Sequence, residues 1–205
     1  MSDTGFPSGW RFFWLSSAVV LVIGIGVPAA HGFETDALRW GIRFTARSSA
    51  VLFLLAFVAS AMVRLFPSAP SRWLRANRRH LGLAFAFSHG VHAGQIIAYA
   101  SQGPQQYAAA VTPDMIIAGS IGYALIILMA ATSFQRPAAM IGRSAWSILH
   151  LAGISWLWLQ FVIAFGKRAA MGGPIYWFFL GLFAVALALR IVAWRRSAGQ
   201  TSLPT

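Results

Sequence analysis

The chain has 205 residues, of which 58% are hydrophobic and only 10% are charged. A soluble domain of this size has about a quarter of its residues charged, so the composition excludes a water-soluble globular protein. The formal net charge is +12, but the arginines lie between apolar runs, as topology signals of membrane proteins do, and not in the single stripe of a nucleic-acid-binding protein. The chain has no cysteine, which excludes disulfides and thiolate metal sites.

Six apolar runs reach, or nearly reach, the ~20 residues that a membrane-spanning helix needs. In chain order they are Trp10–Ala30, Thr45–Phe66, Leu81–Ala100, Met115–Phe134, Ala145–Phe165 and Ile175–Trp194. Proline or glycine marks most of the breaks between them. The sequence therefore predicts an all-α integral membrane protein, a six-helix bundle that forms a single domain over residues 1–205.

The first run resembles a secretory signal at Val27-Pro28-Ala29, but its apolar stretch exceeds the usual length of such signals. We therefore expect it to be retained as a transmembrane helix. The six runs contain no internal repeat, which is an argument against an inverted-repeat transporter.

Basic residues are distributed unevenly over the connections. The second-to-third and fourth-to-fifth connections are rich in arginine, and the C-terminal tail adds Arg195 and Arg196. The third-to-fourth loop has no basic residue, and the fifth-to-sixth has only Lys167 and Arg168. The positive-inside rule therefore predicts that both termini are cytoplasmic. We expect a multi-pass protein of a bacterial inner membrane.

Histidine is the main candidate for chemistry at membrane depth. The four acidic residues, Asp3, Glu34, Asp36 and Asp114, lie at or beyond the ends of the runs. They form neither a carboxylate relay of the kind that proton pumps use nor a serine–histidine–acid set. His89 and His92 lie in the third run and His150 lies in the fifth.

His89 and His92 are three residues apart and project from nearly the same helix face. Counted from Arg143, His150 lies about 10 Å into the membrane. If the fifth helix instead starts just after Pro137, His150 is level with His92. Both depths stay open at this stage.

Three interpretations of these histidines remain. They can hydrogen-bond neighbouring groups and hold helices together. They can bind zinc, although a zinc site needs a third or fourth ligand that the sequence does not offer. They can ligate haem, which needs only two axial ligands and an apolar slot. Methionine is the other realistic haem ligand, and Met140 lies too near the membrane edge.

Two nearby features each have two interpretations. Gly90 and Gly94 surround His92 with the small-xxx-small spacing of close helix packing, and they equally provide clearance for a macrocycle. Arg78, Arg79 and Arg143 are topology signals, and they are also able to pair with haem propionates.

Two stretches resemble a known family. The first is RRHLGLAFAFSHGVH at Arg78–His92, which is similar to the RRxLGL…H third helix of ferric reductase-like transmembrane domains. The second is WSILH at Trp146–His150, which is similar to the WxxLH opening of their fifth helix. This superfamily includes ferric reductases, NADPH oxidases and the haem-carrying membrane subunit of the bacterial methionine sulfoxide reductase system.

The resemblance implies haem b held between the third and fifth helices, and electron transfer across the membrane. His92 matches the third-helix ligand and His150 the fifth-helix ligand, while His89 is an extra histidine able to replace His92. Two-haem members carry a second histidine further along the fifth helix, where this chain has Ile163 and Ala164. One haem is therefore expected rather than two.

Family members that oxidise NADPH append a flavin and nicotinamide domain, and this chain has no GxGxxG motif. Electrons are therefore expected from a separate flavoprotein or a quinol, and the acceptor is unassigned. The leading hypothesis is a haem b electron-transfer protein, acting as a reductase or as a subunit of one. The alternatives are a non-redox transporter or assembly protein with structural histidines, and a lipid-modifying enzyme with a histidine-bound metal.

Overall fold

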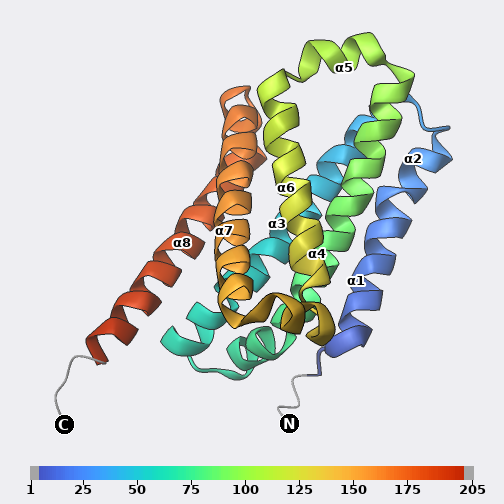
Figure 1. The fold of residues 1–205 in the computed structure, drawn as a ribbon. Coiled ribbons are helices and arrows are strands. Elements are labelled where there is room, and N and C mark those ends of the chain that lie inside the picture. Colours follow the sequence, from blue (N-terminus) through green and yellow to red (C-terminus); the bar gives the residue numbers. More distant parts are fainter. Residues whose placement is uncertain (1–4, 201–205) are drawn as a thin grey trace.

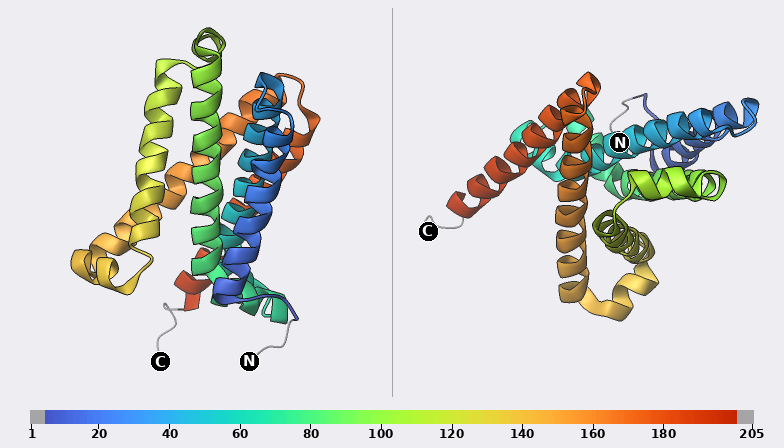
Figure 2. Two further views of the ribbon diagram at one scale, coloured as in Figure 1. Left: turned by 90° about the vertical axis from the view of Figure 1, so that its right-hand side faces the viewer. Right: turned by 90° about the horizontal axis from the view of Figure 1, so that it is seen from above.

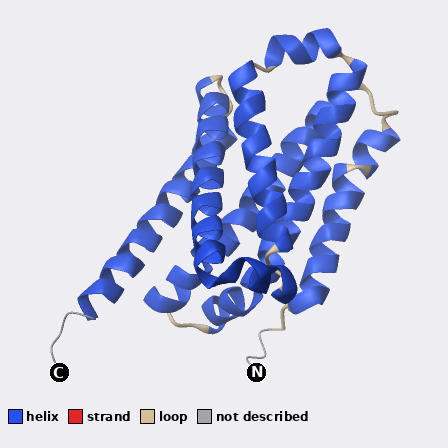
Figure 3. Cartoon of the chain, viewed as in Figure 1, coloured by secondary structure: helices blue, strands red, loops and turns tan. Residues whose placement is uncertain are grey.

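The computed structural model describes residues 5–200, with side chains described to residue 197. All regular secondary structure in that range is helical (Figure 3). The helices are α1 (Gly9–Gly24), α2 (Gly26–Ala30), α3 (Thr35–Leu65), α4 (Ala69–Gln102), α5 (Pro104–Ala110), α6 (Pro113–Ala131), α7 (Gln135–Ala170) and α8 (Pro174–Gln200). Six helical stretches are long and apolar enough to cross a membrane, with α1 and α2 forming one of them. This confirms the predicted all-α, six-span architecture.

The bundle has two distinct ends (Figure 1). The start of α1, the end of α8 and the α3–α4 and α6–α7 turns lie at what we call the proximal end. Helix α5 and the α2–α3 and α7–α8 turns lie at the distal end. Helices α3 and α4 form the central pair, with α1 packed on α4, α8 on α3, and α7 between α6 and α8 (Figure 2).

Several helices extend well beyond the predicted spans. Helix α3 begins at Thr35 rather than Thr45, and α4 begins at Ala69 rather than Leu81. Hydropathy detects only the apolar part of a helix, whereas capping decides where the helix starts. At α4, Ser68 and Ser71 form a capping box, with each side chain bonded to the backbone N–H of the other.

The first span is broken at Ile25 because of Pro28. Proline has no N–H and its ring clashes with the carbonyl four residues earlier, which here is that of Gly24. The freed Gly24 carbonyl accepts a hydrogen bond from the Gln95 side chain of α4. A Cβ added to Gly41 of α3 would lie 2.6 Å from Gln95 Nε2, so this glycine makes room for the contact.

The fifth span is broken at Gly142, whose φ of 76° and ψ of 164° are not helical. Residues 135–141 form a short helix across the proximal end, and the long membrane-crossing part of α7 follows (Figure 1). A non-glycine residue rarely adopts this conformation. The alternative in which a continuous fifth helix starts after Pro137 is therefore wrong.

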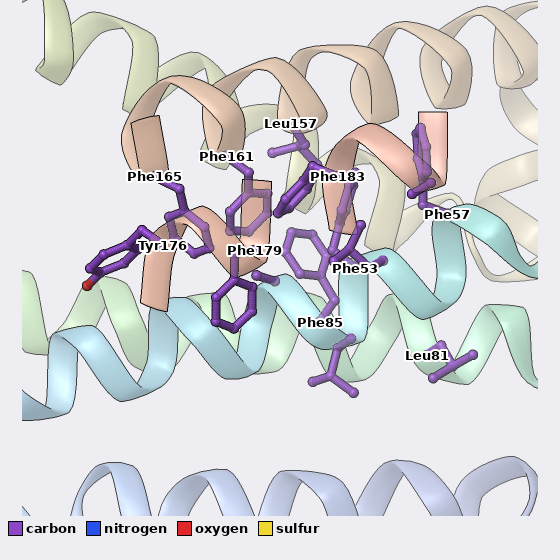
Figure 4. Close-up of a cluster of buried hydrophobic side chains, with 14 of the residues drawn as sticks. Phe53, Phe57, Leu81, Phe85, Leu157, Phe161, Phe165, Tyr176, Phe179 and Phe183 are labelled. Carbon is purple, nitrogen blue, oxygen red and sulfur yellow. The ribbon is translucent and has the colours of Figure 1, made fainter. Parts of the chain in front are cut away.

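An aromatic cluster joins α3, α7 and α8 (Figure 4). The Phe161 ring centroid lies 5.4 Å from those of both Phe53 and Phe183, and Phe183 is fully buried. Such ring pairs contribute about 0.5–1.5 kcal/mol each beyond their buried area. In lipid, packing of this kind replaces the hydrophobic effect as the force between helices, so Phe183→Ala is the single change expected to loosen α8 most.

Candidate functional site

A cavity of about 590 Å³ lies near the proximal end, between α3, α4, α6 and α7. Its walls are mainly apolar and include Phe53, Phe57, Phe85, Ile126 and Leu157. This volume is within the usual range for sites that hold a small molecule or cofactor, about 300–1,000 Å³. The cavity is therefore the candidate binding site of the bundle.

Arginines border this apolar space. Arg75, Arg78 and Arg79 of α4 line it, and none of its lining residues is acidic. Arg75 and Arg78 both donate to the Ser60 hydroxyl, Arg78 at 3.5 Å. The Arg79 guanidinium lies 4.9 Å from the centroid of the Phe134 ring. An apolar cavity with cations at one side and no carboxylate suits a ligand that is apolar at one end and anionic at the other.

His150 of α7 also lines the cavity. Its Nε2 lies 3.2 Å from Thr132 Oγ1, and its ring stacks on Trp146 with centroids 4.2 Å apart. Thr132 Oγ1 donates its only hydrogen to the Leu128 carbonyl at 2.7 Å, so the His150 Nε2–H donates to Thr132. His150 thus has Nδ1 as its unprotonated nitrogen, and a ligand bond through Nε2 requires the release of Thr132.

His92 is held by α3. Its Nδ1 lies 3.2 Å from the Ile42 carbonyl and 3.0 Å from Thr45 Oγ1. Because a carbonyl can only accept, the contact with Ile42 requires a hydrogen on Nδ1. The neutral ring therefore has an unprotonated Nε2. This is the usual state of a metal-ligating histidine, whose second nitrogen donates to a carbonyl or carboxylate.

His89 lies beside His92, with ring centroids 5.1 Å apart. Its Nδ1 is buried and has no hydrogen-bond partner. The rings of Tyr123 and Phe161 pack around it at 5.1 and 5.9 Å. An unpaired buried nitrogen costs about 1–3 kcal/mol, so His89 is not held in the way that a purely structural histidine would be.

The structure does not bring His92 and His150 to one cavity. Phe161, which contacts His89, lies about three turns beyond His150, or about 16 Å along α7. On α4 the cavity lining extends to Ala86, and His92 lies about 9 Å further along. His150 is thus close to the proximal end, as the shallow depth counted from Arg143 predicts, and His89 and His92 form a separate level nearer the distal end.

The glycines beside His92 have space around them. A Cβ added to Gly90 or Gly94 meets no atom within 4 Å, so neither glycine serves close helix packing within this chain. Close packing occurs instead at Gly153, where a Cβ would lie 2.5 Å from the sulfur of Met129.

Four residues of the two levels are not identifiable from the sequence. Three of them contact a histidine of another helix: Thr45 contacts His92, Thr132 contacts His150 and Tyr123 contacts His89. The fourth, Met129, lines the cavity and lies among other apolar residues in the sequence. Met129 lines the cavity, whereas Met140 is 86% exposed on the segment before Gly142. Helical periodicity carries no signal for such contacts.

Among the described residues, no group of three or more histidine, cysteine, aspartate or glutamate side chains is arranged to hold a metal ion. Within that part of the chain, a zinc site with three or four protein ligands of these types is not present. Comparison with family models, with curated proteins and with solved structures finds no match for the chain.

Proposed function

We propose that this chain is a haem b-binding membrane protein that transfers electrons within or across the membrane, as a reductase or as the membrane subunit of one. The observation that carries the proposal is the proximal cavity, which combines apolar walls, His150 and three arginines with no acidic residue in its lining. Haem b is an apolar macrocycle with two propionates and an iron that accepts imidazole. When bound, it would supply a one-electron redox centre.

The residues of the cavity fit this group. His150 offers an imidazole from α7, and Arg78 and Arg79 line the same cavity and could pair with the propionates. Gly82 leaves open space on the α4 wall, where an added Cβ meets no atom within 4 Å. We propose His92, with its unprotonated Nε2, as an iron ligand at the separate level that it shares with His89. A single haem held by both His92 and His150 does not fit the separation of the two levels, since His150 lies about 16 Å along α7 from Phe161, which contacts His89.

The proposed orientation has the proximal end and both termini in the cytoplasm of a bacterium, since the arginine-rich turns lie at that end. A separate flavoprotein or quinol supplies the electrons. A soluble donor would dock by charge steering on the proximal stretch Arg72–Arg79. The resemblance to ferric reductase-like transmembrane domains supports haem binding and electron transfer, but the single haem shared by His92 and His150 that it implies is not part of this proposal, and it does not identify the acceptor.

The test is haem per protein, with the reduced-minus-oxidised spectrum, for the purified full chain and for His150→Ala and His92→Ala. His150→Ala should lose haem from the proximal cavity, and His92→Ala should leave that haem in place. His31→Ala, which changes an exposed histidine of the distal end, is the matched control and should retain the parent spectrum. Absence of haem from the parent protein after haem supplementation, or full haem in His150→Ala, would overturn the proposal.

One observation favours a non-redox transporter or assembly protein as the second candidate. Thr45 Oγ1 bridges His92 and Gln95, at 3.0 and 3.1 Å, and Gln95 in turn bonds the Gly24 carbonyl of α1. This series of hydrogen bonds links α1, α3 and α4, and polar contacts of this kind stabilise helix association in lipid. If the histidines are structural only, the parent protein binds no haem and His92→Ala lowers its thermal stability.

A further inference from the structure

Three arginines of α4 and α8 converge on α3 near the proximal end. Arg75 and Arg78 of α4 both donate through Nη1 to the hydroxyl of Ser60, Arg78 at 3.5 Å. Arg190 of α8 donates through Nη1 to the Phe57 carbonyl at 2.9 Å, and Phe57 lies about 4.5 Å before Ser60 along α3. The charge of Arg78 is close enough to act on Arg190. The three guanidinium groups and the Ser60 hydroxyl form what we call the arginine cluster.

The arginine cluster has no counter-charge from the described part of the chain. Between residues 5 and 197 the one ion pair joins Arg39 to Asp36, which belong to the distal end of α3. A guanidinium has five N–H donors, and each arginine of the cluster bonds a single acceptor in that range. The Ser60 hydroxyl accepts from two arginines, and its own hydrogen remains available. The cluster therefore presents many unused donors and no anion.

Arg190 lies within the sixth span and not in a loop. It is five residues before Arg195, or about 8 Å further into the membrane along α8. Trp194 lies about 6 Å further out than Arg190 and is 68% exposed, as tryptophans at the headgroup level are. The Arg190 guanidinium lies 4.3 Å from the centroid of the Phe57 ring. A cation at this depth is costly unless it is paired, and the Phe57 carbonyl and ring are only uncharged partners.

This depth selects an anion that is already part of the membrane. Arginine side chains extend from below the headgroups towards the phosphates, so a lipid phosphate of the proximal leaflet is within reach of Arg190. A soluble anion would first have to cross the headgroup layer. Basic pockets between membrane helices bind anionic headgroups in this way. A zwitterionic headgroup adds a cation, which three arginines repel.

We propose that the arginine cluster binds the phosphate of an anionic phospholipid in the proximal leaflet. Arg75, Arg78 and Arg190 donate to the phosphate oxygens, as guanidinium groups do in paired hydrogen bonds, and the Ser60 hydroxyl donates to the same group. Helices α4 and α8 each pack on α3, so a shared phosphate would connect them. The proposal is independent of haem, because Ser60 and Arg190 do not line the proximal cavity.

The test is the affinity of the full chain for phosphatidylglycerol, with the protein produced without haem and purified in a nonionic detergent. Native mass spectrometry counts the lipids bound per chain. We expect one phosphatidylglycerol to bind about tenfold more tightly than phosphatidylcholine with the same acyl chains. Arg75→Gln/Arg190→Gln should weaken that binding about tenfold. The matched control, Arg11→Gln/Arg136→Gln, removes the same charge from exposed proximal positions and should leave the affinity unchanged.

Two competitors identify the source of the anion. Neither inorganic phosphate nor haem should displace the bound phosphatidylglycerol. Displacement by phosphate would assign the cluster to a soluble anion, displacement by haem would assign it to the propionates, and either result overturns the proposal. Equal affinity for the two lipids, or equal loss in the two double variants, overturns it as well. If Arg190→Gln prevents folding, Arg75→Gln alone, at an exposed position, should still weaken binding about threefold, and an unchanged affinity would contradict the proposal.

Discussion

Filling the proximal cavity from Gly82 should separate folding from cofactor binding. Gly82 lines the cavity, and an added Cβ meets no atom within 4 Å. Leucine at this position can therefore extend into the cavity without displacing the backbone. We expect Gly82→Leu to stabilise the cofactor-free protein and to exclude haem.

The size of the stabilisation follows from two contributions. Replacing glycine in a helix interior by a good helix former contributes about 1 kcal/mol. Filling about 80 Å³ of cavity, at about 24 cal/mol per Å³, contributes about 2 kcal/mol. Loss of leucine rotamer freedom offsets about 0.5–1 kcal/mol. The net gain is about 2 kcal/mol, or a rise of about 4–8 °C in the melting temperature of a chain of this size.

The assay is thermal unfolding of the cofactor-free protein in detergent, beside haem per protein after supplementation. Gly181→Leu is the matched control, because Gly181 also lies inside a helix with equally open space but outside the cavity. It should retain haem and gain only the helix-propensity part of the stability. Gly82→Leu with a full haem content would refute the cavity as the cofactor site, and a lowered melting temperature would refute the open space at Gly82.

Arg78→Gln should weaken haem binding about 10- to 100-fold, since a hydrogen bond to a charged group contributes about 1.5–3 kcal/mol. Arg72→Gln, outside the cavity, should not, and titration of haem into the cofactor-free protein measures both. Reporter fusions at the C-terminus and within residues 101–113 should score as cytoplasmic and external respectively, and the reverse pair would invert the proposed orientation. The purified chain, free of flavin, should not oxidise NADPH, so rapid haem reduction by NADPH alone would contradict the need for a separate donor.

The architecture was predictable from sequence because hydrocarbon imposes a simple rule on composition. A run such as Met115–Phe134 has to be helical and about 20 residues long to cross the membrane, and the structure has α6 at Pro113–Ala131. Helix ends were less predictable, since hydropathy does not register polar turns such as those that begin α4. The cap at Ser68 is a local sequence signal that a hydropathy profile does not detect.

The candidate site was predictable only in part. The intramembrane histidines could be recognised because burying a polar group in the membrane costs free energy. The two possible depths of His150 depended on where the fifth helix starts. That question was decided by Gly142, whose positive φ cannot be read from the helical pattern around it. Partners such as Thr45 and Thr132 depend on contacts between helices, which a single sequence does not encode in any spacing.

The break at Gly142 also sets the rotational phase of the fifth span. Residues after Gly142 form a continuous helix through His150, so one residue inserted between Arg143 and His150 would rotate the imidazole by about 100° about the helix axis. The same insertion between Gln135 and Ile141 would lengthen the short proximal helix and be taken up at the glycine. Changes in length before Gly142 therefore leave the orientation of His150 towards the cavity unchanged, whereas changes in length between Gly142 and His150 alter it.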